Sequence, residues 1–162
     1  MDMSKQAFQA LIAEVTGAIA GKPMDGALAD ELNREFPADG EAFGAIGEAC
    51  HTAIAEGWMC EQEAGGVRYG RVIKPGPETH GFSVDVVRMA DLEGPYHRHP
   101  NGEIDMVMPI DGAAQFDGHG AGWCVYGPGT AHHPTVRGGA ALVLYLLPEG
   151  AIDFKARPGD GG

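Results

Sequence analysis

The sequence predicts a mainly β domain, a small antiparallel β-barrel or jelly roll, with an α-helical N-terminal segment packed on it or swapped across it. Apolar residues recur at helical spacing over residues 4–57, and short runs rich in Val, Ile, Tyr and Phe follow from residue 58. No helical period separates those runs, which is typical of antiparallel barrels and not of βαβ units. At 162 residues the chain is long enough for one domain with its own core.

The N-terminal segment, residues 1–57, is expected to contain three helices. The first carries an apolar stripe at i, i+3, i+4, i+7 and i+11, formed by Phe8, Leu11, Ile12, Val15 and Ile19. The sequence GKP at 21–23 ends it, and Asp25 is expected to cap a second helix that PADG at 37–40 breaks. A third apolar stripe then runs to Gly57.

The β-barrel is expected to span residues 58–156. Its strands are predicted from six runs of four to eight residues: VRYGRVIK, FSVDVVRM, IDMVMPI, AAQF, WCVYG and ALVLYLLP. Asp-Gly pairs at 111–112 and 117–118 lie between runs and indicate hairpins. The last residues, 157–162 (RPGDGG), read as a loose C-terminal tail.

Composition excludes several classes of partner. The chain has 23 Asp and Glu against 11 Lys and Arg, a formal charge of −12, which disfavours nucleic acid and anionic membranes. Its three cysteines share no CxxC spacing, which indicates a reducing compartment. With neither a signal-peptide pattern nor an apolar run of about 20 residues, we expect a cytoplasmic protein.

The residues best suited to chemistry are histidines and carboxylates in two clusters. Five of the seven histidines fall between positions 97 and 133. In HRHPNGE, His97 and His99 lie two apart and so point to the same side of a strand, and the Pro-Asn-Gly turn can bring Glu103 back toward them. GPGTAHHP supplies a further imidazole, His132 or His133. Such a shell suits one divalent transition metal ion, which could be iron, manganese, nickel, cobalt or zinc.

These two clusters resemble the two motifs of the cupin superfamily. GPYHRHPNGE matches the first motif, a glycine followed by HxH, three residues and a glutamate; GWCVYGPGTAHHP matches the second, a glycine, a proline-glycine turn and a histidine. The resemblance implies that His97, His99 and Glu103 are metal ligands from the first motif. It implies that His132 is the ligand from the second.

The chain departs from the cupin pattern at three points. Only two residues separate Gly94 from His97, a proline directly precedes Gly129, and Val136 stands where asparagine is frequent. These departures leave His133 open as the fourth ligand in place of His132.

A narrower resemblance covers nearly the whole chain. LNREFPADG, AEGWMC, YGRVIKP, HGFSVDVV, HRHPNGEID and ALVLYLLPEGAI resemble 4-hydroxylaminobenzoate lyases, small cupin enzymes of nitroaromatic breakdown. The resemblance implies conversion of 4-hydroxylaminobenzoate to 3,4-dihydroxybenzoate (protocatechuate) with release of ammonia. Small cupins commonly dimerise, so a homodimer is expected.

For that reaction, three residues are candidates for proton transfer or for lining the pocket. Asp105 lies two residues beyond Glu103, on the same face of a strand, and could act as general acid or base. His133 could transfer protons if His132 binds the metal. Glu78 stands at the mouth of a predicted strand.

Four residues are candidates for holding an aromatic carboxylate. Arg71, on a predicted strand, is the first choice for a bidentate pair with the carboxylate. Tyr96, Trp123 and Tyr126 could stack on the substrate ring.

Other functions fit the same residues. The chain could be another cupin enzyme, a dioxygenase or isomerase acting on a small aromatic or carbonyl compound, because the same four ligands would serve. It could also be a non-catalytic cupin that binds a small molecule. In a metal-free site, the histidines and carboxylates would act only as acids and bases.

Overall fold

The computed structural model describes residues 4–155, in which three helices precede nine strands. The helices are α1 (Lys5–Ile19), α2 (Gly26–Glu35) and α3 (Glu41–Glu56), and a short 3₁₀ helix, η1, spans Pro77–Thr79. The strands are β1 (Gln62–Ala64), β2 (Val67–Ile73), β3 (Phe82–Glu93), β4 (His97–His99), β5 (Glu103–Pro109), β6 (Gln115–Phe116), β7 (Gly122–Tyr126), β8 (Thr130–His132) and β9 (Thr135–Pro148). The predicted mainly β fold with helices at the N-terminus is confirmed, while the tail predicted at 157–162 lies outside the described residues.

The helix ends follow from local chemistry. Asp25 caps α2 as predicted, because its side chain accepts a hydrogen bond from the Leu28 amide at 3.0 Å. Ser4 caps α1 in the same way through the Ala7 amide. Gly57, with φ +86°, ends α3 in the left-handed conformation that glycine adopts at little cost. Within residues 4–155, none of the helices has both the length and the apolar character needed to cross a membrane.

The strands form two antiparallel layers, which agrees with the predicted jelly roll, and the large sheet does not close into a barrel. The large sheet has the order β1-β2-β3-β9-β5-β7, with β6 paired to β9, and its two ends are not hydrogen-bonded to each other. The second layer pairs β4 with β8. It is extended by a bridge between Arg98 and Asp153, whose amides and carbonyls exchange two hydrogen bonds of 2.9 Å. This arrangement is a jelly roll with an open edge.

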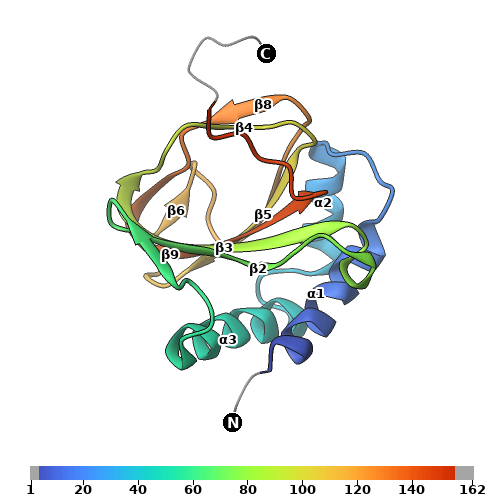
Figure 1. Cartoon of the computed structure of the whole chain (residues 1–162), viewed down its shortest axis with the longest axis horizontal. Helices are drawn as coiled ribbons and strands as arrows, with labels where there is room; N and C mark the ends of the chain where they lie inside the picture. Colours follow the sequence, from blue (N-terminus) through green and yellow to red (C-terminus); the bar gives the residue numbers. More distant parts are fainter. Residues whose placement is uncertain (1–3, 156–162) are drawn as a thin grey trace.

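The alternation of side chains along β3, β5 and β9 divides the core in two. One face, which includes Val86, Met106 and Leu144, packs against the helices. The other face, which includes Val87 and Val143, belongs to a second cluster. Figure 1 shows α1 and α3 beneath the large sheet and β4 and β8 above it. The upper face of the sheet is therefore the one available to a site.

Trp123 belongs to the helical side, which corrects the expectation that it stacks on a substrate. Its Cα pairs with Met106, so both side chains point toward the helices. The Trp123 indole donates a hydrogen bond of 2.9 Å to the Phe36 carbonyl and meets the Phe43 ring edge-on, with centroids 6.0 Å apart. A change of one residue in strand register would have reversed its direction.

Replacing Asn33 with Ala should destabilise the fold. Asn33 on α2 accepts a hydrogen bond from the Trp123 amide at 2.9 Å and donates one to the Trp123 carbonyl at 3.0 Å, and so closes the edge of β7. Without it, two partly buried backbone groups lose their partners, at a cost of about 1–3 kcal/mol of unfolding free energy. Urea denaturation measures this change. Asn33→Asp, which keeps the acceptor only, should lose less, and an unchanged midpoint for Asn33→Ala would contradict the assignment.

Candidate metal centre

Four side chains bring their donor atoms together between the two layers. These atoms, from His97, His99, Glu103 and His132, all lie within 4.8 Å of one another. β4 carries the first two histidines on one side, β8 carries His132 with its Cα paired to that of His97, and Glu103 is the first residue of β5. Three of the four are buried, and His132 is partly buried.

A glycine turn brings Glu103 to the histidines. Gly102 has φ +89°, and its amide donates a hydrogen bond of 3.2 Å to the His99 carbonyl. A Cβ at this position would lie 2.8 Å from the Tyr126 carbonyl oxygen, which backbone atoms cannot accommodate without moving. The Glu103 Oε1 consequently comes within 3.2 Å of the His99 Nε2.

The outer nitrogens of the two β4 histidines face oxygen acceptors. His97 Nδ1 lies 3.2 Å from the Pro95 carbonyl. His99 Nδ1 lies 3.2 Å from the Thr130 hydroxyl, which donates its own proton to the Gly127 carbonyl at 2.7 Å and can therefore accept. The ring protons are thereby placed on Nδ1, and both Nε2 atoms present lone pairs to the cluster.

Asp117 is the oxygen acceptor that faces the outer nitrogen of His132. Its Oδ2 accepts hydrogen bonds from His132 Nδ1 at 2.6 Å and from the Tyr126 hydroxyl at 2.5 Å, while its Oδ1 accepts from the Thr135 amide at 2.9 Å. Burial raises the pKa of Asp117, but His132, Tyr126 and Thr135 together lower it below its ordinary value. Asp117 is therefore a carboxylate that orients a histidine, an arrangement common behind metal ligands.

The distances within the cluster fit a metal ion. His97 Nε2 and His132 Nε2 are 3.2 Å apart, and the separations to the Glu103 oxygens run from 3.2 to 3.8 Å. Donors about 2.0–2.2 Å from one ion are about 3 Å apart when they subtend a right angle. His99 Nε2 and both Glu103 oxygens are buried without a hydrogen-bond partner, an expensive state that a cation would relieve.

The protonation state of His99 is also the one that a metal site needs. Burial lowers the pKa of His99, which favours the neutral imidazole that a metal requires.

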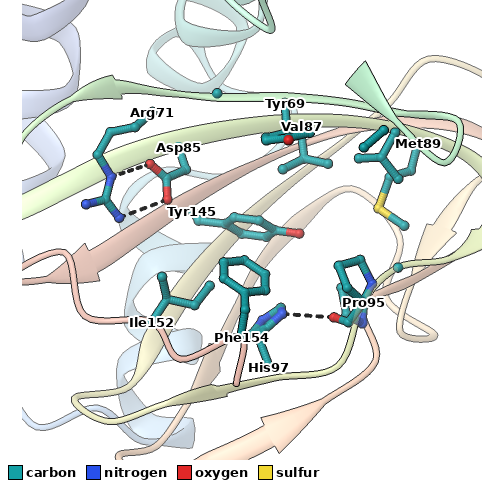
Figure 2. A pocket seen from close by; sticks show the side chains of 15 residues that line it. Tyr69, Arg71, Asp85, Val87, Met89, Pro95, His97, Tyr145, Ile152 and Phe154 are labelled. Carbon is teal, nitrogen blue, oxygen red and sulfur yellow. Dashed lines mark hydrogen bonds and ion pairs between the residues drawn. The ribbon is translucent and has the colours of Figure 1, made fainter. Parts of the chain in front are cut away.

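A cavity of about 440 Å³ adjoins the cluster, and His97 forms part of its wall. The cavity lies between the large sheet and the second layer, and most of its lining is apolar, including Met89, Ile152 and Phe154. Arg71 and Asp85 lie together on the wall in a bidentate ion pair of 2.8 and 3.2 Å (Figure 2). A cavity of this size suits a small aromatic molecule.

The family model of 4-hydroxylaminobenzoate lyase (PnbB) matches residues 10–154 of the chain. The chain belongs to the 4-hydroxylaminobenzoate lyase family. It is 35% identical over 145 residues to the 4-hydroxylaminobenzoate lyase of Pseudomonas putida, covering 78% of this chain and 82% of that one. It is 34% identical over 136 residues to the enzyme of the same name from Nocardioides sp. (strain LMS-CY), covering 78% and 80%. The family and the lyase class expected from the sequence are thus confirmed.

Among solved structures, the DMSP lyase DddQ from Ruegeria pomeroyi covers 98% of this chain and is itself covered completely. Its sequence identity to this member of the 4-hydroxylaminobenzoate lyase family is 22%, and the TM-score is 0.42.

The structure brings His132, and not His133, to the cluster of this lyase-family chain. His133 is 42% exposed, and its Nδ1 faces Glu93 at 3.2 Å and the Gly94 carbonyl at 3.3 Å. Tyr96 packs on the His133 ring, with centroids 4.9 Å apart, and does not line the cavity. The proton-transfer role expected for His133 and the substrate contact expected for Tyr96 are therefore corrected, because both side chains lie outside the site.

Glu78 also lies outside the site. It is exposed on η1, where the chain folds back on itself through a hydrogen bond of 2.9 Å between the Gly81 amide and the Gly76 carbonyl. Glu78 does not line the cavity, so the expectation of a catalytic role is corrected.

Asp105 and Tyr126 lie close to the cluster. Asp105 is fully buried below Glu103, with Cys124 Sγ 3.9 Å from its Oδ2 and no partner for its Oδ1. Burial, followed by the charge of Glu103, raises the pKa of Asp105 well above its ordinary value, so this carboxyl holds a proton. The Tyr126 ring lies 4.6 Å from that of His132, but its hydroxyl is bound to Asp117. The acid–base role of Asp105 and the substrate contact of Tyr126 stay predictions.

Three residues at the site were not predicted from the sequence. Asp117 was interpreted only as part of a hairpin turn, and its left-handed φ (+49°) agrees with a turn. The sequence signal for its second role was an acidic residue shortly before the second histidine cluster. Asp85 and Tyr145, on opposite strands of the cavity wall, lie in runs whose period indicated only strands.

Replacing His132 with Ala should reduce bound metal strongly, whereas replacing His133 with Ala should not. The first change removes a donor atom from the cluster, which should weaken divalent metal binding at least about 10- to 100-fold. The His133→Ala change removes an exposed imidazole that is next to His132 in the sequence but lies outside the cluster. Elemental analysis of the purified variants, after dialysis at fixed metal concentration, measures the difference. Equal metal content in the two variants would rule out the assignment of His132.

Proposed function

We propose that the chain converts 4-hydroxylaminobenzoate to 3,4-dihydroxybenzoate and ammonia, using one divalent transition metal ion held by His97, His99, Glu103 and His132. The observation that carries this proposal is the convergence of four donor atoms beside a largely apolar cavity, in a chain of this lyase family. The substrate is a small aromatic carboxylate, and the reaction needs no external oxidant.

The overall reaction consumes one molecule of water, because two water molecules are added and one is released. The N–O bond breaks and its electron pair leaves with the oxygen, which departs as water. A second water loses a proton and forms a C–O bond at the ring carbon adjacent to the one that bears nitrogen, giving a hydroxylated imine. A third water hydrolyses the C=N bond and releases ammonia, and loss of the ring proton restores the aromatic catechol. Nitrogen is thus reduced as ring carbon is oxidised.

The donor set supports a role for a metal in this chemistry. When bound, an ion at this site would act as a Lewis acid toward the hydroxylamino oxygen or would lower the pKa of a bound water. Three neutral imidazoles and one carboxylate leave coordination positions open and suit iron, manganese, nickel, cobalt or zinc. The apolar cavity walls would pack against the substrate ring and limit the access of bulk water to the imine.

Arg71 remains the candidate for binding the substrate carboxylate, although it already forms an ion pair with Asp85. Nε and Nη2 donate to the Asp85 carboxylate, and Nη2 also donates to the Gly150 carbonyl at 3.1 Å. Of the five guanidinium hydrogens, both on Nη1 therefore have no partner among the described residues. These two hydrogens are available to bind one carboxylate.

The central test is turnover of 4-hydroxylaminobenzoate by purified protein without oxygen. We expect ammonia and 3,4-dihydroxybenzoate in equal amounts, and loss of more than about 90% of the rate after removal of the metal by a chelator. Adding back single divalent metals should restore the rate. Full activity in metal-free protein would refute the role of the metal, and oxygen consumption without ammonia would indicate a dioxygenase.

Substitutions of the ion pair should change KM in opposite directions. Arg71→Met removes the carboxylate donor and should raise KM by about 10-fold or more, since hydrogen bonds to charged groups contribute about 1.5–3 kcal/mol. Asp85→Asn frees Arg71 from its counter-ion and should lower KM. Arg88→Met, the same chemical change outside the cavity, is the matched control. A KM for Arg71→Met equal to that of the control would exclude Arg71 as the carboxylate site.

A further inference from the structure

Tyr145 is the one inward-facing residue of β9 that carries a polar group into the cavity wall. Its Cα pairs with Asp85 on β3 and with Asp105 on β5, so it lies at the centre of the upper face of the large sheet. Only 5% of the residue is exposed, and it lines the same cavity as His97 and Arg71.

The Tyr145 hydroxyl makes no hydrogen bond with any residue in the range 4–155. Tyr126, the other tyrosine near the cluster, donates a hydrogen bond of 2.5 Å to the Asp117 carboxylate. Figure 2 shows the Tyr145 ring lying across the cavity, with its hydroxyl directed away from the Arg71–Asp85 pair and toward the side of Pro95. The Tyr145 side chain is buried, but its hydroxyl faces the cavity and has no partner among the described residues, so it is free to hydrogen-bond to a ligand that enters there.

The dimensions of the Tyr145 side chain match those of the substrate. Both a tyrosine side chain and a para-substituted benzoate are benzene rings with substituents at opposite ends. The Arg71–Asp85 pair lies near the Cα end of Tyr145, since Asp85 is its neighbour across the strands. A substrate ring lying along Tyr145, with its carboxylate on Arg71, would therefore place its para nitrogen beside the Tyr145 hydroxyl.

We propose that the Tyr145 hydroxyl is a catalytic group that hydrogen-bonds to the hydroxylamino oxygen and gives it a proton as the N–O bond breaks. This inference rests on the proposed function. The departing oxygen takes the electron pair of the N–O bond and leaves as water, and the water that adds to the ring returns a proton to the phenolate. No other reactant is required.

The electrostatics of the position are consistent with a donor. Burial, followed by the charge of Glu103, raises the pKa of Tyr145 well above its ordinary value. The phenol therefore holds its proton at neutral pH until a strongly basic oxygen develops beside it.

The test is Tyr145→Phe, which removes one oxygen and keeps the ring. With 4-hydroxylaminobenzoate, kcat for ammonia release should fall about 100-fold, the usual range for loss of a proton donor, with KM changed less than threefold. A fall of less than 10-fold would overturn the proposal. So would a parallel loss of bound metal or of thermal stability, because the role would then be structural.

A ligand without the N–O oxygen provides the matched comparison. Calorimetric titration with 4-aminobenzoate should give the same Kd, within twofold, for the wild type and for Tyr145→Phe, since this ligand lacks the atom that Tyr145 contacts. Weaker binding of 4-aminobenzoate to the variant would overturn the assigned contact. A wild type that releases no ammonia would refute the proposed function and this inference together, whereas an active wild type with an equally active variant would refute only the inference.

Discussion

Three imidazole nitrogens and one carboxylate meet in a buried space where His99 Nε2 and both Glu103 oxygens have no hydrogen-bond partner. Each histidine uses its outer nitrogen on an oxygen acceptor: the Pro95 carbonyl, the Thr130 hydroxyl or the Asp117 carboxylate. The inner nitrogens are therefore left with lone pairs that face each other and the Glu103 oxygens. Such a concentration of donor atoms is costly without a cation. The pairing of β4 with β8 and the turn at Gly102 both serve to hold this arrangement.

The two faces of the large sheet have different roles: one packs against the helices and stabilises the fold, and the other carries the candidate site. The lower face buries a large apolar cluster against the helices, and this does not depend on the metal ligands. The upper face carries a row of polar side chains at one register level, on neighbouring strands: Arg71, Asp85, Tyr145, Asp105 and Cys124. This row forms the floor below the second layer, and the cavity opens above part of it. Substitutions on the two faces should accordingly have different effects, on unfolding below and on turnover above.

The sequence predicted what depends on local spacing. Helical periods located the three helices, and the HxH spacing with its Gly-containing turn located the donors on β4 and β5. Facing directions were harder, because they depend on strand register: Trp123 shares a strand with Cys124 but points to the helices. Asp117 and Tyr145 could not be assigned since their roles arise from contacts across strands. Closure of the barrel also depends on long-range pairing, and the large sheet stays open.

The bridge between Arg98 and Asp153 bears on how the protein matures during synthesis. The strand that carries two of the four donors is flanked on one side by β8 and tied on the other to a residue near the end of the chain. Such contacts form late, because distant parts of the chain must first be brought together. A growing chain can thus assemble its helices while still on the ribosome, but the strand bearing His97 and His99 acquires all its neighbours only after position 153 has emerged. The four donor atoms can therefore reach their final arrangement only after that point.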